Sequence, residues 1–132
     1  MDKVVLLLSL TFWHECRGEG EHGIRGVASV VWNRSAPAKG KYDLSWTVLR
    51  PRQFSCWNGR DTRGLTEPVC DNDADRQAWA MCVKIAEEMV DKTFKPIDNY
   101  THYYNPDRCT PFWKDDLTNV KRIGSHVFGK EV

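Results

Sequence analysis

The sequence lacks several features that would assign it to a common functional class. It has no CxxC pair and no HExxH motif, so we expect neither a zinc ribbon nor a zinc peptidase, and no metal or other cofactor. Its apolar N-terminal stretch, VVLLLSLTFW at residues 4–13, is much shorter than the roughly 20 residues that cross a bilayer. The charge is nearly balanced, at 19 basic and 18 acidic residues for a net charge of +1. Nucleic acid is therefore not expected as the main partner.

What the sequence does have is the composition of one globular domain. Its 132 residues, 41% hydrophobic and 28% charged, suit a single domain over residues 1–132, which we expect to be a monomer. Six tryptophans and four tyrosines provide flat amphipathic rings, some of which suit a carbohydrate groove. Of the five cysteines at least one is unpaired, and Cys56 and Cys70 are candidates for a disulfide across a loop.

The spacing of apolar residues predicts four helices and two extended segments. The helices are expected at about residues 3–16, 23–35, 44–50 and 74–92, and the extended segments are NYTHYYN (99–105) and RIGSHVF (122–128). Residues 52–73, rich in Gly, Asp and Asn, are predicted to form a long loop, and loops of this length are usually functional. The pattern predicts an α+β domain that is mostly helical with a small β element.

The stretch WHECRGEGEHG, residues 13–23, places Glu15 and Glu19 directly after the apolar N-terminal helix. Glu15 lies in the last turn of that helix, where the dipole disfavours a negative charge. Burial beside Phe12 and Trp13, together with the charge of Glu19, acts in the same direction and raises the pKa expected for Glu15. A carboxylic acid that stays protonated near neutral pH is the proton donor that cleavage of a glycosidic bond requires. We therefore predict Glu15 as a general acid.

The spacing of the two glutamates also limits the chemistry. On a continuous helix their Cβ atoms would lie about 5–6 Å apart and on the same side of a substrate. Inverting glycosidases instead place two carboxyl groups on opposite sides of the sugar, about 6.5–9.5 Å apart, so Glu19 is a poor opposing base. Two alternatives stay open: a substrate hydroxyl attacks internally, or another acid serves as the base, with Asp43, Asp61 and Asp71 available.

Four motifs in the right order resemble the SleB-type cell wall hydrolases. They are HECRGEGEHGIRGVASVVWNR, RPRQFSCW, THYYNP and RIGSHVF, and the similarity runs from Phe12 to Phe128. The resemblance implies a lysozyme-like fold and cleavage of the bond between N-acetylmuramic acid and N-acetylglucosamine in peptidoglycan, in the manner of a lytic transglycosylase. It places the acid/base role on Glu15. The sequence departs from the family pattern at Cys16, where serine or alanine is common, and at Trp13-His14, which replaces a Tyr-Gly-like pair.

The remaining site predictions concern the second glutamate, the long loop and the first extended segment. Glu19 is the second catalytic candidate, and the candidates for substrate binding are Gln53, Ser55, Trp57, Tyr103, Tyr104 and Asn105. Gln53 and Ser55 have side chains suited to acetamido groups, and Trp57 to stacking on a sugar ring. On a strand Tyr103 and Asn105 share one face and Tyr104 the other, and the sequence leaves open which faces the substrate. His126 is expected to be a hydrogen-bonded structural histidine.

The expected biological setting is lysis of a host bacterium by a phage endolysin. A lone catalytic domain without an export signal fits a protein made in the host cytoplasm that reaches the cell wall after release by a holin. A prophage protein or a bacterial remodelling enzyme is the alternative. The expected partner is the peptidoglycan glycan strand, with no stable membrane association. Three rival functions stay open: a hydrolytic muramidase on the same bond, a metal-dependent cell wall peptidase or amidase, and a non-catalytic wall-binding protein.

Overall fold

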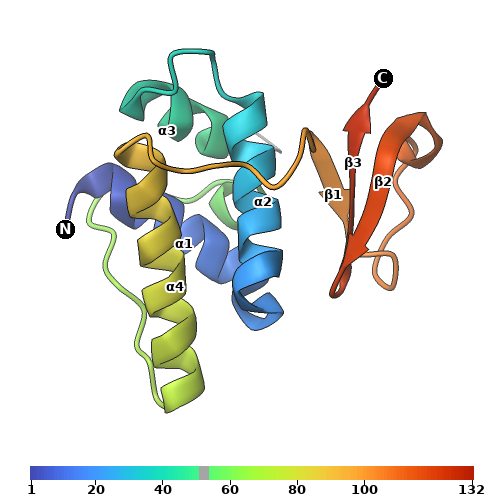
Figure 1. Cartoon of the computed structure of the whole chain (residues 1–132). Coiled ribbons are helices and arrows are strands. Elements are labelled where there is room, and N and C mark those ends of the chain that lie inside the picture. The colour runs from blue at the N-terminus through green and yellow to red at the C-terminus, as the bar shows by residue number, and fades with distance from the viewer. Residues whose placement is uncertain (51–53) are drawn as a thin grey trace.

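A computed structural model of the chain describes residues 1–50 and 54–132. Within these residues, four α-helices gather on one side and a three-stranded antiparallel sheet stands on the other (Figure 1). The helices are α1 (Lys3–Cys16), α2 (Gly20–Arg34), α3 (Lys41–Leu49) and α4 (Asp73–Val90), and the strands, in spatial order, are β1 (His102–Tyr104), β3 (His126–Glu131) and β2 (Leu117–Ile123). Three short 3-10 turns are η1 (Arg17–Glu19), η2 (Ser55–Trp57) and η3 (Lys114–Asp116). The mostly helical α+β architecture expected from the sequence is confirmed.

Helix α1 is the centre of the helical part, and α2, α3 and α4 pack around it. It is buried on nearly every side from Val5 to Trp13, as expected for a helix that is apolar all round. Its buried hydroxyl groups are satisfied within the helix, since Ser9 and Thr11 donate to carbonyl oxygens one turn earlier at 2.6 and 2.8 Å. The apolar N-terminal stretch is thus a core helix. None of the helices in the described ranges has the length and apolarity needed to cross a membrane.

Helix α2 joins the helical part to the sheet. At Gly26, a Cβ atom would lie 2.7 Å from Cζ of Phe128, so the absence of a side chain allows β3 to approach the helix closely. At the end of α2, the Asn33 side chain donates to the carbonyl oxygens of Asp98 and Tyr100, both at 2.8 Å. These contacts hold the chain that leads into β1. They give a structural reason for the asparagine of the Asn-Arg pair at the end of the first motif.

The sheet differs from the prediction in two respects, a hairpin turn and an additional length of strand. The segment RIGSHVF, expected to be a single extended stretch, contains the turn of a hairpin, with Ile123 of β2 paired with His126 of β3. Gly124 has a φ of +59°, a left-handed conformation that glycine adopts without strain. Strand β2 leaves most of its side chains in solvent, so it lacked the apolar alternation that identifies a strand.

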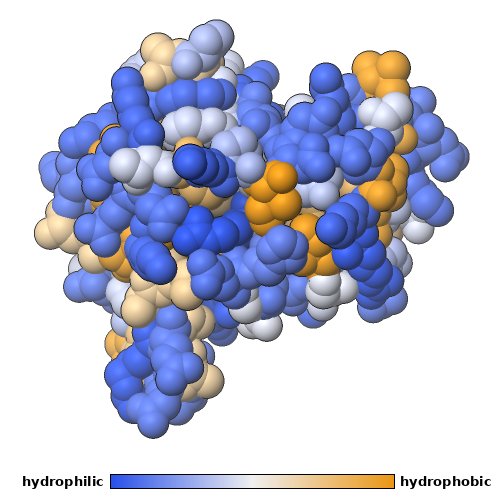
Figure 2. Space-filling model, viewed as in Figure 1, coloured by the Kyte–Doolittle hydropathy of each residue, from blue (hydrophilic) through white to orange (hydrophobic). Residues whose placement is uncertain are grey.

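The long loop between η2 and α4 forms no regular element from residue 58 to residue 72. It leads into α4, where the Asn72 side chain caps the helix by accepting from the N–H of Asp75 at 2.8 Å. Figure 2 shows this end of α4 as a hydrophilic projection from the molecule. All five cysteines lie within the described ranges and are free thiols, so Cys56 and Cys70 form no disulfide across the loop.

Candidate active site

A cleft of about 540 Å³ lies where the helical part meets the sheet. One wall consists of residues 13–19, which form the end of α1 and the turn η1. The opposite wall comes from the loop after β1, through Asn105 and Arg108, from the β2–β3 turn, through Ser125, and from the first residue of β3, His126. The cleft therefore depends on segments that are about 90 to 110 positions apart in the sequence, and both glutamates of the first motif line it.

Glu15 lies on the last turn of α1 and is half-buried. Its Oε1 atom accepts a hydrogen bond from the Tyr103 hydroxyl at 3.0 Å. Burial raises the pKa of the Glu15 carboxyl, and the hydrogen bond from Tyr103 opposes that rise by favouring the charged form. The direction agrees with the sequence prediction, and the main cause is burial.

Tyr103 reaches Glu15 from the sheet and is held on two sides by other rings. It pairs with Phe128 in the β1–β3 register, and their rings stack with centroids 5.7 Å apart. The ring of His126 meets Tyr103 edge-on at 5.2 Å. Burial is the largest cause of a pKa well above the usual range for Tyr103, so its hydroxyl keeps its proton and acts as a donor to Glu15.

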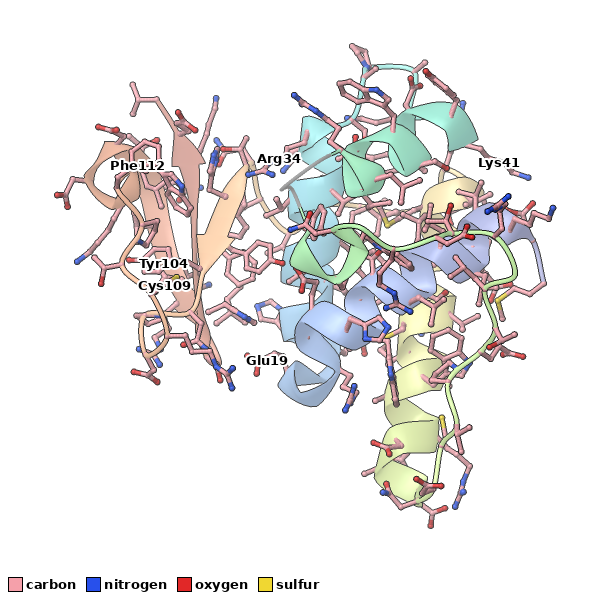
Figure 3. All side chains as sticks on the ribbon, turned by 180° about the vertical axis from the view of Figure 1, so that it is seen from behind. Glu19, Arg34, Lys41, Tyr104, Cys109 and Phe112 are labelled. Atoms are coloured by element: carbon pink, nitrogen blue, oxygen red, sulfur yellow. The ribbon has the colours of Figure 1, made fainter. Side chains whose placement is uncertain are left out.

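Glu19 has a different environment from Glu15, although it is only four residues away. Helix α1 ends at Cys16, as predicted, and the turn η1 contains Glu19, so the Cβ spacing of a continuous helix does not apply to this pair. Oε1 of Glu19 accepts from the backbone N–H of Ser125 at 2.8 Å, and a Cβ atom at Gly124 would lie 2.6 Å from that oxygen. Figure 3 shows Glu19 at the junction between the helices and the sheet. Glu19 thus fastens the β2–β3 turn to the helical part.

His126, the first residue of β3, is buried beside Glu19. Its Nδ1 atom lies 3.6 Å from Oε1 of Glu19 and, among the described residues, has no hydrogen-bond partner. Burial lowers the pKa of His126, and the negative charge of Glu19 opposes this. The imidazole is therefore neutral near pH 7. The expectation of a hydrogen-bonded structural histidine does not hold for Nδ1.

The other predicted binding residues divide into three groups. Asn105 lines the cleft together with the two glutamates. Trp57 is only 6% exposed and its indole N–H donates to the Thr11 hydroxyl at 2.8 Å, so it belongs to the core, which speaks against the predicted sugar stacking. Tyr104 is buried on the other face of β1 with its ring edge-on to Trp113, and it does not line the cleft. Gln53 and the side chain of Ser55 are outside the described part of the chain.

The three aspartates considered as an opposing base are all absent from the cleft lining. Asp43 accepts from the N–H of Gly40 at the start of α3, Asp61 pairs with Arg63 at 2.9 Å, and Asp71 is exposed before α4. Among the described residues, no group of three His, Cys, Asp or Glu side chains is placed to hold a metal ion. Of the described residues, the acids that line the cleft are Glu15 and Glu19, and Glu19 is the one that accepts from a backbone N–H.

Residues 18–129 match the sequence profile of the Cell Wall Hydrolase family. The chain belongs to this family. It is 29% identical over 126 residues to the spore cortex-lytic enzyme of Oceanobacillus iheyensis, covering 96% of this chain and 41% of that protein. It is 25% identical to the enzyme of the same name from Bacillus subtilis, covering 94% of this chain and 36% of that protein. The chain therefore spans about two fifths of the length of these relatives.

Two solved structures share the fold over nearly the whole chain. The catalytic domain of the Bacillus cereus SleB protein is 27% identical, with a TM-score of 0.64 over 97% of this chain and 90% of that one. The catalytic domain of the germination-specific lytic transglycosylase SleB from Bacillus anthracis is 26% identical, with a TM-score of 0.66 over 98% and 96%. The family resemblance drawn from the four motifs is thus confirmed.

The departures from the cell wall hydrolase pattern have structural roles. The Cys16 thiol donates to the carbonyl oxygen of Phe12 at 3.3 Å, and burial raises its pKa well above the usual range, so it is a packed, protonated thiol. Trp13 packs edge-on against Trp79 at 5.9 Å and lies under the guanidinium of Arg17 at 4.6 Å. Sequence reasoning had not assigned Arg17 or Arg108 to the site. Arg17 at least stands within the first motif, whereas nothing in the sequence marked Arg108.

Proposed function

We propose that this cell wall hydrolase is a lytic transglycosylase that cleaves the bond between N-acetylmuramic acid and N-acetylglucosamine, with Glu15 as acid and then base. The observation that supports it most is the environment of Glu15: a half-buried carboxyl with a raised pKa that faces a mainly polar cleft. A carboxyl in this state carries a proton to the site at a pH where an exposed glutamate would have lost it.

In the proposed reaction, Glu15 first protonates the glycosidic oxygen, and the bond from that oxygen to C1 of the muramic acid breaks. The departing sugar takes the proton of Glu15, and the positive charge that develops at C1 faces a carboxylate. The 6-hydroxyl of the same muramic acid then attacks C1 and gives its proton back to Glu15. A 1,6-anhydro ring forms, no water is consumed, and Glu15 returns to its starting state. The Tyr103 hydroxyl stabilises the carboxylate in the interval between the two proton transfers.

The hydrogen bond between Glu19 and the backbone of Ser125 favours transglycosylation over hydrolysis. A hydrolase of the inverting type needs a second carboxylate that activates water on the opposite face of the sugar. Among the described residues that line the cleft, Glu19 is the other acid, and its Oε1 already accepts from Ser125. Internal attack by the substrate needs no second carboxylate. The name of the B. anthracis relative, a lytic transglycosylase, agrees with this choice.

The decisive test is mass spectrometry of the products that the purified protein releases from peptidoglycan sacculi. Anhydro ends, lighter by one water than reducing ends, are expected, and reducing muramic ends would identify a hydrolytic muramidase instead. Glu15→Gln should abolish release of either product. Glu87→Gln, an exposed glutamate on α4, is the matched control and should keep full activity. Activity that survives in Glu15→Gln would overturn the assignment.

The same assay separates the rivals from other classes. A metal-dependent peptidase or amidase would release peptides rather than disaccharide units and would lose its activity in a chelator. We expect glycan products and no effect of the chelator. A non-catalytic wall-binding protein would leave the sacculi undigested, with the wild-type protein and Glu15→Gln giving the same result.

We propose lysis of a host bacterium by a phage as the setting in which the protein acts, on the wall outside the cytoplasm. The names of the relatives indicate a second setting, the spore cortex. A comparison of turnover on vegetative sacculi and on purified cortex separates the two. Faster digestion of vegetative sacculi supports host lysis, and faster digestion of cortex overturns it.

A further inference from the structure

Two guanidinium groups in the cleft have no part in the chemistry proposed for Glu15. Arg17 is on η1, on the helical wall, and Arg108 is on the loop after β1, on the sheet wall. Both residues are exposed. Over residues 1–50 and 54–132, neither side chain forms a salt bridge with a carboxylate. Each wall of the cleft thus carries one guanidinium group that is not paired with a carboxylate of the described residues.

The acids of the cleft do not neutralise these two groups. Glu15 accepts from the Tyr103 hydroxyl, and Glu19 accepts from the backbone of Ser125. Arg17 is also held in place, since its guanidinium lies over the ring of Trp13 at 4.6 Å. A guanidinium that stacks on an aromatic face keeps its in-plane N–H donors, which match the two oxygens of a carboxylate. An anion that enters the cleft with a substrate therefore has two donors available.

In peptidoglycan the anions are on the peptide stems. The sugars themselves carry hydroxyl and acetamido groups and are neutral, whereas the stems attached to the lactyl group of muramic acid carry free carboxylates. We propose that Arg17 and Arg108 bind stem carboxylates, so that the cleft selects glycan strands that carry stems over bare strands. This inference rests on the proposed function, because it assumes a muramic acid residue beside Glu15.

The test measures binding separately from turnover. Glu15→Gln protein is sedimented with three forms of the same sacculi, all stripped of phosphate-bearing wall polymers. One form is untreated, one has lost its stems to an amidase, and one has its carboxylates converted to neutral amides. The third form keeps the bulk of the stem and removes its charge, which separates recognition of charge from recognition of shape. Adding back the phosphate polymers shows whether they provide a second anion.

We expect untreated sacculi to bind about tenfold more tightly than the other two forms, since exposed ion pairs contribute up to about fivefold each. Arg17→Ala combined with Arg108→Ala, in the Glu15→Gln protein, should remove this preference, and raised salt should weaken it. Arg50→Ala is the matched control, because the Arg50 guanidinium lies over Trp46 at 4.5 Å on α3 and Arg50 is not part of the cleft lining. It should keep the preference.

Equal binding to all three forms, or a preference that the double variant keeps, would overturn the proposal. Arg108→Glu is a second variant for the case in which loss of Arg17 unfolds the protein. It should remove the preference, since Arg108 has an exposed side chain and the new carboxylate offsets the charge of Arg17. A melting temperature for each variant confirms that it is folded. Activity in Glu15→Gln would refute the proposed function, and this result is separate from any change in the stem preference. Loss of the stem preference alone would refute only the role of the two arginines.

Discussion

Removal of a single oxygen atom, in Tyr103→Phe, tests how the pKa of Glu15 is controlled. The Tyr103 ring stacks on Phe128 and meets His126 edge-on, and neither contact needs the hydroxyl. The phenylalanine ring should therefore keep its place, and the hydrogen bond to Oε1 of Glu15, 3.0 Å long, is the interaction that is lost. The variant changes the acid and leaves the packing intact.

The expected effects follow from the two opposing influences on Glu15. Burial raises its pKa and the Tyr103 hydrogen bond lowers it, so loss of the bond raises the pKa further. Glu15 must be protonated to start the reaction, so activity falls as the pH rises through this pKa. The alkaline limb of the pH–rate profile should move to higher pH. A hydrogen bond to a charged group contributes about 1.5–3 kcal/mol. The carboxylate charge of Glu15 is only partly developed in the transition state, so about half of this stabilisation is lost there, which corresponds to a roughly tenfold lower kcat.

The assay is the release of soluble glycan from sacculi as a function of pH, with Tyr104→Phe as the matched control. Tyr104 is the neighbouring residue on the same strand and faces away from the cleft, so its hydroxyl has no role in this argument. Its profile should coincide with that of the wild type. An alkaline limb in Tyr103→Phe that stays in place or moves to lower pH would refute the reasoning, whatever happens to kcat.

Three further predictions concern the residues that support the site. Glu19→Gln keeps an acceptor for the N–H of Ser125 and should retain activity within about threefold, whereas Glu19→Ala leaves that N–H unpaired and should cost about 1–3 kcal/mol of unfolding free energy in a denaturant titration. If Glu19→Gln is as inactive as Glu15→Gln, Glu19 takes part in the chemistry. Trp57→Phe should lower stability by about 1–3 kcal/mol with KM unchanged, and a raised KM at unchanged stability would restore the sugar-stacking role. Gly26→Ala places a methyl group 2.7 Å from Phe128, and this overpacking costs about 1–3 kcal/mol of unfolding free energy, of which the higher helix propensity of alanine returns up to about 1 kcal/mol. Activity should fall by more than this small net loss of stability explains, because Phe128 stacks on Tyr103. Unchanged activity would contradict the close contact.

The helices were predictable because their signals are local. Helix α1 has the predicted bounds, residues 3–16, and α4 begins and ends within two residues of the prediction, since apolar periodicity and the acids at its start are both visible in the sequence. Strand β2 was missed because its side chains are mostly exposed and carry no period-two pattern. The sequence led to Glu15 by the same local logic, from its place at the end of an apolar helix.

The rest of the site depends on contacts between distant parts of the chain. Tyr103 and Glu15 are 88 residues apart, and Ser125 and Glu19 are 106 residues apart. No local pattern shows that one glutamate receives a phenol hydroxyl and the other a backbone N–H. The burial of Trp57 likewise depends on a partner 46 residues earlier, Thr11. Family motifs identify such residues one by one, and the fold shows which of them are in contact.

The two influences on Glu15 are better understood together than apart. A group that only donated a proton would need burial alone, because burial favours the protonated form. A group that only accepted a proton would need a partner that neutralises or holds its charge. In the proposed reaction no other carboxylate is free in the described cleft, so Glu15 must do both within one cycle. Burial favours the protonated form of Glu15, which the first step needs, and the hydrogen bond from the Tyr103 hydroxyl stabilises the carboxylate, which the second step needs. The sheet therefore contacts both acids of the cleft. The N–H of Ser125 occupies an oxygen of Glu19, and the Tyr103 hydroxyl lowers the pKa that burial raises in Glu15.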